Sequence, residues 1–359
     1  MLQLIVKNFG VLKDINIELN KTNLFIGDNG SGKSVLAKLI TILTSYDNFS
    51  DTLIEEFNRF DINFIENNTF IKFTDNNKII LTIEKNKINF SSDALKTLDT
   101  INETYNMLNK FSNPNNISID SMLPKFFISQ YIPAERNLIS LLNKSIFSLV
   151  TANIPLPKNL MTFAGEYEKA KNSIKELNIL NMKYLSINGQ DRIYYDDLNY
   201  LPLENSSSGI QTALPLYLTL KYFKEKKYHN IMVEEPEQNL YPKSQINTIK
   251  YIVENSYKNL YLMTHSPYVL SILNVLLFAY KASDKNDILK EKISAIIPKE
   301  QQINPDKFSA YLIKDGKSEN IKGKSTGMIQ SNVIDDISDT LDDNYNELME
   351  IYREFKSDK

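Results

Sequence analysis

Apolar positions along the first 45 residues follow a strand-like pattern and then a helical one. Residues 2–6, 6–10 and 14–19 read as strands around a short turn, and the apolar run 21–26 predicts a buried strand. Residues 35–43 are apolar at helical spacing. This part of the chain is therefore predicted to fold as three strands, a loop and a helix.

In the next segments the spacing of apolar residues changes from helical to alternating. Residues 69–73, 78–84 and 87–90 alternate between apolar and polar side chains about a turn at 75–77, which predicts an antiparallel arm. A helix over 94–111 and a polar linker over 112–121 follow.

The middle of the chain predicts one strand and two helices. The strand covers 125–132, and the first helix covers 137–150. The second helix, over 160–185, rests on apolar residues at helical spacing: Tyr167, Ala170, Ile174, Leu177 and Leu180. It is far too short for the long coiled-coil arm of a chromosome-organising ATPase.

After residue 206, helices and strands alternate. Helices are predicted over 210–225, 243–255 and 267–282, with strands over 230–233 and 259–263 between them. That alternation favours a mostly parallel sheet covered by helices. A hairpin is predicted at 308–314 and 319–322, and an acidic helical segment over 332–355.

These elements suggest one α/β head with insertions. The head comprises 1–45 and 200–325, and its sheet is expected to be mixed and largely parallel with flanking helices. Residues 46–125 form the antiparallel β arm and a helix, and 126–199 form a switch strand and a helical insertion. Residues 326–359 form the acidic helical tail.

The amino-acid composition excludes several kinds of functional site. The chain has 359 residues and no cysteine, which excludes disulfides, thiolate zinc sites and cysteine nucleophiles. The formal net charge of −3 gives no global basicity that argues for nucleic acid, although a local basic patch remains open. No apolar run is long enough for a membrane span and the N-terminus does not resemble a signal peptide, so we expect a cytoplasmic protein.

The strongest chemical signal is a phosphate-binding loop at residues 27–34, between the predicted strand 21–26 and the helix that follows. Glycines let backbone N–H groups point at phosphate oxygens, and the helix N-terminus favours negative charge. Lys33 would contact the outer phosphates and Ser34 would bind Mg²⁺. The residues expected to bind nucleotide are Gly27, Asp28, Asn29, Gly30, Ser31, Gly32, Lys33, Ser34 and Val35.

Two further sites supply catalytic groups. The apolar strand 231–233 ends in Glu234 and Glu235, and we assign Glu234 to the metal and Glu235 to the attacking water. His265 follows the next strand, where an imidazole could reach the terminal phosphate, or it could cap the next helix. The chain's other histidine, His229, precedes the acidic strand and is expected to be structural.

Two weaker sites complete the set. Residues 206–211, Ser-Ser-Ser-Gly-Ile-Gln, directly precede a helix, where Ser208, Gly209 and Gln211 are candidates for nucleotide contact and a plain helix cap is the alternative. Arg136, in the segment 131–137, could pair with phosphate or with Glu135 in a surface ion pair.

Taken together, these motifs resemble the ABC-type ATPase superfamily in its SMC/RecF/OLD-like branch. The P-loop, the signature at 206–211, the acidic strand, Asn239-Leu240 and His265 occur in the family's order. The Glu-Glu-Pro-Glu segment and the Ile-Pro-Ala-Glu-Arg segment are similar to OLD and PtuA-type ATPases of bacterial defence modules. Two positions depart from the family pattern: Glu234 replaces the usual aspartate, and Ile210 replaces the signature's second glycine.

The resemblance implies a mechanism. One subunit's P-loop would bind ATP and Mg²⁺, and the other subunit's Ser208 and Gly209 would close the site, which gives an ATP-dependent homodimer with Asn239 and Leu240 at its seam. The family's OLD-type nucleases carry a further metal-binding domain, for which the residues after 282 are too few, so we expect ATP hydrolysis and no nuclease activity. The acidic pairs 335–336 and 342–343 are interpreted as a solvated helix.

Three functions remain open at this stage. The first is a regulatory ATPase of an anti-phage module that controls a companion nuclease or toxin. The second is a DNA repair or chromosome ATPase that clamps duplex, and the third is a nucleotide-gated scaffold with little hydrolysis. The segments 46–125 and 138–200 are the expected partner-reading surfaces.

Overall fold

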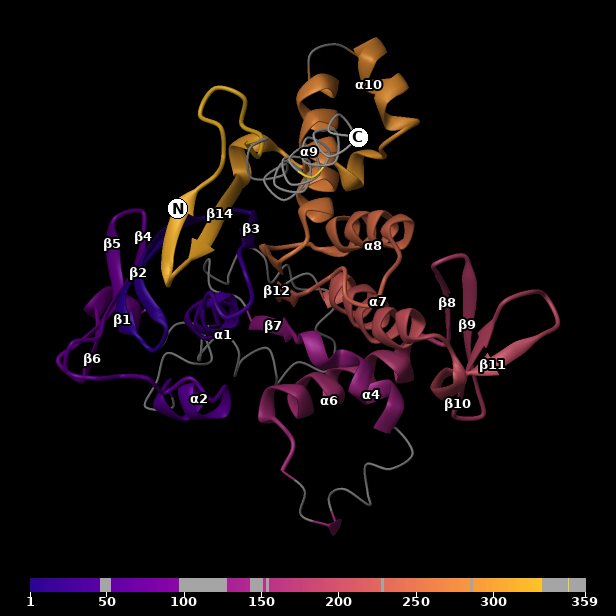
Figure 1. The fold of residues 1–359 in the computed structure, drawn as a ribbon, viewed down its shortest axis with the longest axis horizontal. Coiled ribbons are helices and arrows are strands. Elements are labelled where there is room, and N and C mark those ends of the chain that lie inside the picture. Colours follow the sequence, from indigo (N-terminus) through magenta and orange to yellow (C-terminus); the bar gives the residue numbers. More distant parts are fainter. Residues whose placement is uncertain are drawn as a thin grey trace, which may run out of the picture.

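The fold is built on one large mixed sheet with helices on both faces and a small second sheet at one end (Figure 1). The computed structural model describes residues 1–45, 53–96, 128–142, 151–152, 155–226, 229–284, 287–330 and Leu348. Within these residues the large sheet has 11 strands in the order β6-β5-β4-β1-β2-β15-β14-β3-β13-β12-β7. The mixed α/β class expected from the sequence is confirmed.

One half of the large sheet is antiparallel. β1 pairs with both β2 and β4, and β4 continues through β5 to β6. The strands of the predicted arm therefore do not project separately but extend the main sheet, because β4 hydrogen-bonds along the edge of β1. The bounds are β1 (Leu2–Phe9), β2 (Leu12–Leu19), β4 (Phe70–Asp75), β5 (Lys78–Glu84) and β6 (Lys87–Phe90).

The other half contains a block of parallel strands. β3 lies between β14 and β13, and β12 lies between β13 and β7, with every one of these pairings parallel. β15 then runs antiparallel to β14 and meets β2. The bounds are β3 (Thr22–Ile26), β7 (Ile128–Ile132), β12 (His229–Glu234), β13 (Leu260–Thr264), β14 (Phe308–Lys314) and β15 (Lys317–Asn320).

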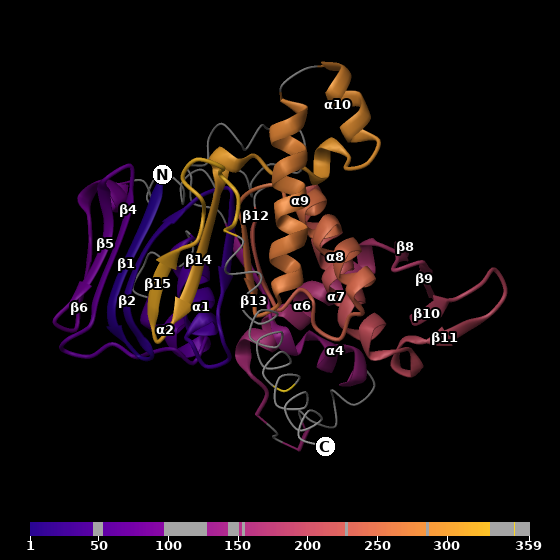
Figure 2. The same cartoon turned by 45° about the horizontal axis from the view of Figure 1, so that its top comes forward.

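Helices cover both faces of the parallel block, which explains the continuous apolar runs of its strands. Alternate residues belong to different cores: Phe25 packs with α1 (Lys33–Leu43), whereas Leu24 packs with helices of the opposite face. Figures 1 and 2 show that second layer beside the sheet. It contains α6 (Lys158–Ser173), α7 (Ser208–Lys226), α8 (Pro242–Asn255) and α9 (Pro267–Ser283).

The second sheet corrects one prediction. The helix expected over 160–185 ends at Ser173, and the chain then forms a four-stranded antiparallel sheet. Leu177 and Ile179 alternate inward with period two, and Leu180 and Asn181 take positive φ in the connecting turn, which a helix cannot accommodate. The strands are β8 (Glu176–Ile179), β9 (Met182–Ile187), β10 (Gln190–Tyr194) and β11 (Tyr200–Pro202).

Shorter elements connect these layers. They are the helices α2 (Leu53–Arg59), α4 (Asn137–Leu142) and α10 (Asp287–Ser294), and the 3-10 turns η4 (Ala134–Arg136), η5 (Leu203–Asn205), η6 (Lys299–Gln301) and η7 (Pro305–Lys307). The predicted linker 112–121, and all of the predicted acidic tail 332–355 except Leu348, lie outside the described residues, as do most of the helix 94–111 and half of 137–150.

Candidate functional site

The phosphate-binding loop turns tightly between the end of β3 and the start of α1. Gly30 and Gly32 adopt φ of 79° and 104°, conformations that L side chains rarely take. A Cβ on Gly27 would lie 2.1 Å from the carbonyl oxygen of Ile313 on β14, so only glycine fits there. The loop therefore depends on its glycines for both backbone conformation and close packing.

The side chain of Lys33 folds back onto the loop. Its Nζ donates to the carbonyl oxygens of Gly27 at 2.6 Å and Asp28 at 2.7 Å, and the residue is 9% exposed. Burial lowers the pKa of Lys33, and nearby carboxyl groups, with Glu235 first, act in the opposite direction. The ammonium group is thus held at the loop and close to the acidic strand.

The other loop residues divide into exposed and supporting positions. Asp28, Asn29, Gly30 and Ser34 are exposed, while Val35 is half-buried against the core around α1. Ser31 is buried, and its Oγ has no hydrogen-bond partner among the described atoms.

Sheet register brings the predicted catalytic groups to the same edge. In the parallel block, Ile26 pairs with Thr264 and Met263 pairs with Glu234, so β3, β13 and β12 end side by side. The next residues along the chain are Gly27, His265 and Glu235. Ligands of parallel sheets bind at the carboxyl ends of the strands, so this edge is the expected position for a nucleotide.

Glu234 has the features of a metal ligand. It is 5% exposed, and its Oε1 has no hydrogen-bond partner within the described part of the chain. Burial raises the pKa of Glu234, and the neighbouring hydroxyls of Tyr131 and Ser34 oppose that rise. A buried, unpartnered carboxyl oxygen beside a serine hydroxyl fits the oxygen ligands that Mg²⁺ prefers.

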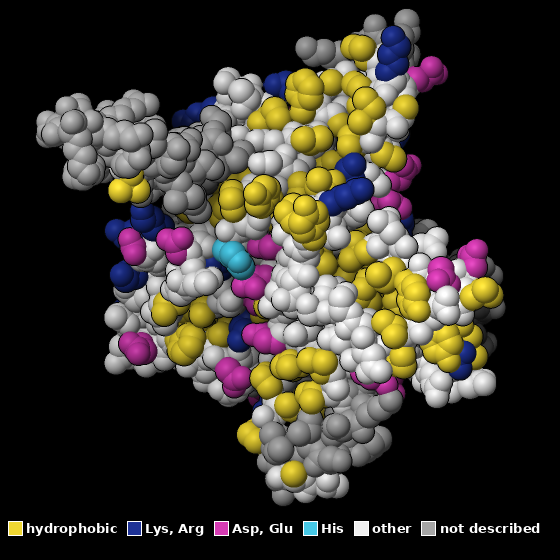
Figure 3. Space-filling model, turned by 45° about the vertical axis from the view of Figure 1, so that its right-hand side comes forward, with side chains coloured by type: hydrophobic (Ala, Val, Ile, Leu, Met, Phe, Trp, Pro, Cys, Tyr) yellow, Lys and Arg dark blue, Asp and Glu magenta, His cyan; other side chains and the backbone are white. Residues whose placement is uncertain are grey.

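Glu235 and His265 face each other at the surface. Glu235 has a positive φ of 43°, and its N–H donates to the carbonyl oxygen of Met263 at 2.8 Å. His265 Nδ1 lies 3.5 Å from Glu235 Oε1, and the two side chains are 44% and 30% exposed. Figure 3 shows histidine and acidic side chains gathered on this face of the molecule. Both groups are accessible to a water molecule or a phosphate.

Sequence reasoning assigned no role to Glu237 or to Tyr131. Glu237 is 5% exposed, and its Oε1 lies 3.8 Å from His265 Nδ1. Burial raises the pKa of Tyr131 well above its ordinary value, so its hydroxyl keeps a proton that it can donate toward Glu234. The sequence contains Glu237 as the last residue of the Glu-Glu-Pro-Glu segment, but it does not reveal that this side chain is buried.

The signature segment lies at the start of α7. Ser207 and Ser208 are exposed. A Cβ on Gly209 would lie 3.0 Å from the carbonyl oxygen of Asn239, so glycine permits close approach of the two segments. Asn239 Nδ2 also donates to Thr212 Oγ1 at 3.0 Å. Ser208 and the 239–240 turn therefore form one continuous surface.

Gln211 supports this surface from inside. Its Nε2 donates to the carbonyl oxygens of Ser206, Glu204 and Leu203 at 2.9, 3.0 and 3.5 Å, and the residue is 7% exposed. The structure therefore turns the Gln211 amide into the protein, away from the nucleotide contact predicted for it.

Arg136 also differs from expectation. It is fully buried, and neither the surface ion pair with Glu135 nor a phosphate contact suits that position. Its guanidinium donates to backbone carbonyl oxygens of Thr212, Pro133, Glu234 and Glu235, at 3.2, 3.1, 2.8 and 2.8 Å. Burial lowers the pKa of Arg136 to about 10, which leaves it charged at neutral pH. Arg136 therefore ties the start of α7 to the end of the acidic strand.

A proline in α7 adds a second tie. Pro215 lacks the N–H that would bond the carbonyl oxygen of Gln211 four residues earlier. Ser140 Oγ on α4 donates to that oxygen instead, at 2.8 Å. The segment 131–142 is thus anchored to the signature helix at two points.

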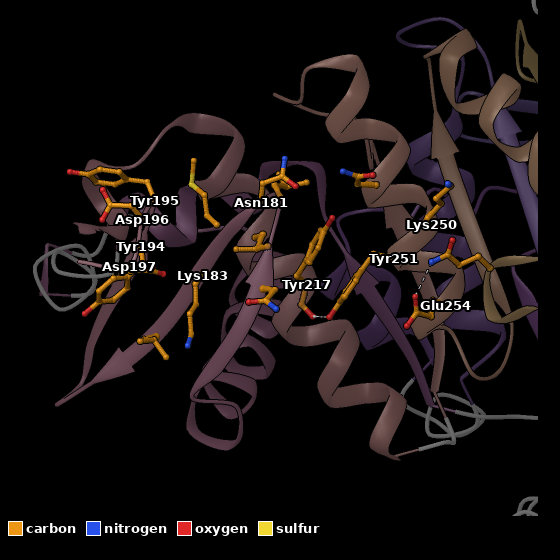
Figure 4. A pocket seen from close by; sticks show the side chains of 17 residues that line it. Asn181, Lys183, Tyr194, Tyr195, Asp196, Asp197, Tyr217, Lys250, Tyr251 and Glu254 are labelled. Carbon is orange, nitrogen blue, oxygen red and sulfur yellow. Dashed lines mark hydrogen bonds between the residues drawn. The ribbon is translucent and has the colours of Figure 1, made fainter. Parts of the chain in front are cut away.

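A groove lies away from this site. It measures about 940 Å³ and separates the β8–β9 hairpin from α8. Figure 4 shows Tyr217 and Tyr251 side by side on its floor, Lys250 and Glu254 on α8, and Tyr194 to Asp197 on the second sheet. None of the predicted site residues lines this groove.

The described ranges lack two further features. No group of three or more His, Cys, Asp or Glu side chains is arranged there to hold a metal ion. The same part of the chain contains no helix whose length and apolar character suit a membrane crossing. The acidic pairs 335–336 and 342–343 lie outside it.

Comparisons with known proteins give one family match and several similar solved structures. The AAA ATPase domain family (AAA_15) matches residues 130–270, which include Arg136, the signature, the acidic strand and His265. No curated protein matches the chain.

Three solved structures are similar at low identity. CbiO1 from Clostridium perfringens, part of the ABC transporter complex cbiONQ, is 14% identical with a TM-score of 0.33, over 89% of this chain and 86% of that chain.

The other two structures are SMC heads. The SMC head domain from Thermotoga maritima is 12% identical with a TM-score of 0.39, over 89% of this chain and 97% of that chain. SmcHead bound to the C-winged helix domain of ScpA is 13% identical with a TM-score of 0.36, over 89% and 96%. The match to an ATPase domain over residues 130–270 is consistent with the phosphate-binding loop at residues 27–34.

Proposed function

We propose that the protein hydrolyses ATP with Mg²⁺, dimerises around the nucleotide and thereby controls a partner effector, a nuclease or toxin of an anti-phage module. The observation that carries the ATPase step is the meeting of Lys33, Glu234, Glu235 and His265 at one edge of the parallel sheet. A P-loop requires such carboxyl groups opposite its lysine.

Each residue has a chemical task in this proposal. The backbone of residues 27–34 and Lys33 orient the triphosphate, Glu235 orients and deprotonates the attacking water, and His265 binds the terminal phosphate. Ser34 and Glu234 would hold Mg²⁺, which when bound neutralises charge on the phosphates. Exclusion of water and completion of the site come from Ser208 and Gly209 of a second copy.

The dimer proposal is supported by the exposed surface formed by Ser208 and the 239–240 turn. A helix N-terminus with exposed serine hydroxyls suits the terminal phosphate of a nucleotide held by another copy. Hydrolysis would remove that bridge, so the state of the dimer would report the state of the nucleotide. An effector that binds one state only would then be controlled by ATP.

The test combines phosphate release with particle size by light scattering, with and without Mg²⁺ and ATP. We expect Lys33→Ala to stay monomeric and inactive, and Glu235→Gln to bind ATP, lose about 10²-fold or more in turnover and accumulate as a dimer. Lys250→Ala, a lysine of the groove, is the matched control and should behave as the unaltered protein. Turnover by Lys33→Ala equal to the unaltered rate would refute the ATPase, and one particle size in all samples would refute the dimer.

The effector is tested separately. Products of the neighbouring genes should be co-expressed with the chain and the complex isolated in the presence of ATP. We expect a nuclease or toxin to co-purify with Glu235→Gln and to be lost from Lys33→Ala. Equal recovery with both variants would show that nucleotide state does not control the partner.

A further inference from the structure

Glu237 lies behind His265, out of reach of solvent. It follows the turn after β12 and is 5% exposed. Its Oε1 accepts a hydrogen bond from Thr264 Oγ1 at 2.6 Å and another from the backbone N–H of His265 at 3.3 Å. Because the carboxyl group is covered on the solvent side, it cannot itself contact a nucleotide or an attacking water.

The same oxygen also lies near the imidazole, at a distance longer than a hydrogen bond. His265 Nδ1 lies 3.8 Å from Glu237 Oε1 and 3.5 Å from Glu235 Oε1, so this ring nitrogen faces both carboxyl groups. An imidazole whose Nδ1–H is directed to a carboxyl group presents Nε2 on its opposite side. With 44% of the side chain exposed, Nε2 is the nitrogen that remains for a ligand.

The second oxygen of Glu237 indicates more than a backbone cap. Oε2 is buried and has no hydrogen-bond partner among the described residues. An unsatisfied buried polar atom destabilises a fold, and a single acceptor would suffice to bond Thr264 and the His265 N–H. A carboxyl group kept in this position despite that cost is typical of a functional site rather than of a core.

Opposite charges surround the group. Arg136 is fully buried, and Glu237 is the foremost of the acidic groups that act to keep it charged; Glu237 also acts on Lys33 in the same sense. Glu237 therefore lies in the electrostatic network of the site as well as in contact with His265.

We propose that Glu237 is a positioning residue that orients His265 toward the terminal phosphate, with Thr264 holding the carboxyl group in place. This inference rests on the proposed ATP hydrolysis. In this role Glu237 acts through the imidazole, so its removal should lower the rate of the chemical step and leave nucleotide affinity nearly unchanged. Loss of a comparable orienting partner of a histidine typically costs 10- to 100-fold in activity.

The experiment is a double-substitution cycle with Glu237→Ala, His265→Ala and both together. Single-turnover hydrolysis and the affinity for a fluorescent ATP analogue are measured for each. We expect Glu237→Ala to lose about 10-fold or more in rate with less than about a threefold change in affinity. In the His265→Ala background, Glu237→Ala should cause no further loss.

Two more variants keep the test independent of folding defects. Glu237→Gln retains an oxygen that can accept from Thr264 and the His265 N–H, so it should recover part of the rate lost in Glu237→Ala. Glu254→Ala, an acidic residue of α8 beside the groove, should hydrolyse ATP at the unaltered rate. If the losses of Glu237→Ala and His265→Ala multiply, or Glu237→Gln is no faster than Glu237→Ala, the assignment is wrong. An unaltered protein that does not hydrolyse ATP would instead refute the proposed function.

Discussion

The nucleotide edge and the groove beside α8 both contain polar side chains, but they differ in how fully those side chains are hydrogen-bonded. At the edge, Ser31 Oγ, Glu234 Oε1 and Glu237 Oε2 are buried without hydrogen-bond partners. None of the described side chains that line the groove has such an atom. Buried unsatisfied polar groups destabilise a fold, so the three at this edge are atoms that a bound ligand would satisfy.

The contrast extends to charge and packing. At the edge, burial lowers the pKa of Lys33 and raises that of Glu234. The groove is built instead from stacked aromatic rings and paired side chains: Tyr217 and Tyr251 lie 4.0 Å apart at 11°, and Gln301 bonds Glu254. The nucleotide edge is therefore the better candidate for catalysis, because the buried ammonium and carboxyl groups with shifted pKa values lie there and the volume of the groove alone does not indicate catalysis.

The largest expected effect on stability comes from Arg136→Met. It removes donors to four backbone carbonyl oxygens and the buried positive charge among Glu234, Glu235 and Glu237. We expect the free energy of unfolding to fall by about 3–5 kcal/mol, measured by urea denaturation. Arg192→Met in the second sheet, which loses a cation–π contact with Tyr200, is the matched control and should cost about 1 kcal/mol. Equal losses would contradict the contrast between the two regions.

The structural role of Arg136 could not be predicted from the sequence. The segment 131–137 was recognised as part of the site, but an arginine next to a glutamate is typical of a surface ion pair. Only the tertiary fold shows that Thr212, Glu234 and Glu235 place their carbonyl oxygens around it. Gln211 is a similar case, since its three carbonyl partners come from the preceding turn. Backbone acceptors have no sequence signal, so these two roles could not have been predicted.

The elements were predicted best where the pattern is long or bounded by strong turns. β12, α8, β13 and α9 match their expected ranges to within a residue or two. The region 174–185 was wrongly predicted as helix because Ile174, Leu177 and Leu180 recur at helical spacing, whereas the strand alternation in β8 involves only Leu177 and Ile179. Strand order was not predictable either: β4 joins β1, and β14 joins β3, through contacts far apart in the sequence.

The next largest loss of stability is expected for Gly27→Ala, and a smaller one for Gly30→Ala. Gly27→Ala would place a Cβ 2.1 Å from a backbone oxygen, so we expect a loss of about 3 kcal/mol. Gly30→Ala meets no atom within 4 Å but keeps a φ of 79°, which costs about 1–2 kcal/mol. Gly189→Ala in the second sheet has a φ of 77° and equally open space, so it should lose the same stability but keep ATP affinity. Impaired ATP binding in Gly189→Ala would contradict the expected difference between the phosphate-binding loop and the second sheet.

Glu234→Gln should stabilise the nucleotide-free protein in a pH-dependent way. Burial raises the pKa of Glu234 above its unfolded value, so its ionisation costs stability as the pH rises through the folded pKa. The amide does not ionise. The free energy of unfolding of the variant should therefore match that of the parent near pH 4 and increasingly exceed it as the pH rises toward 8, while Mg²⁺-dependent turnover is lost. Urea denaturation at several pH values measures the difference; a gain that is constant with pH would contradict the assignment.

The smallest effect is expected in the groove, from Tyr251→Phe. The substitution removes the hydrogen bond from Tyr251 Oη to the carbonyl oxygen of Tyr217 at 3.1 Å and retains the ring stack. The expected loss of stability is about 0.5–1.5 kcal/mol, with ATP turnover unchanged. Thermal unfolding and phosphate release on the same sample measure both quantities. The turnover is the informative one, because α7 begins at the signature segment and α8 follows the 239–240 turn, so these helices connect the groove to the proposed dimer surface. A tenfold fall in turnover would show that the groove and the nucleotide edge act as one unit, contrary to their separation in hydrogen bonding and charge.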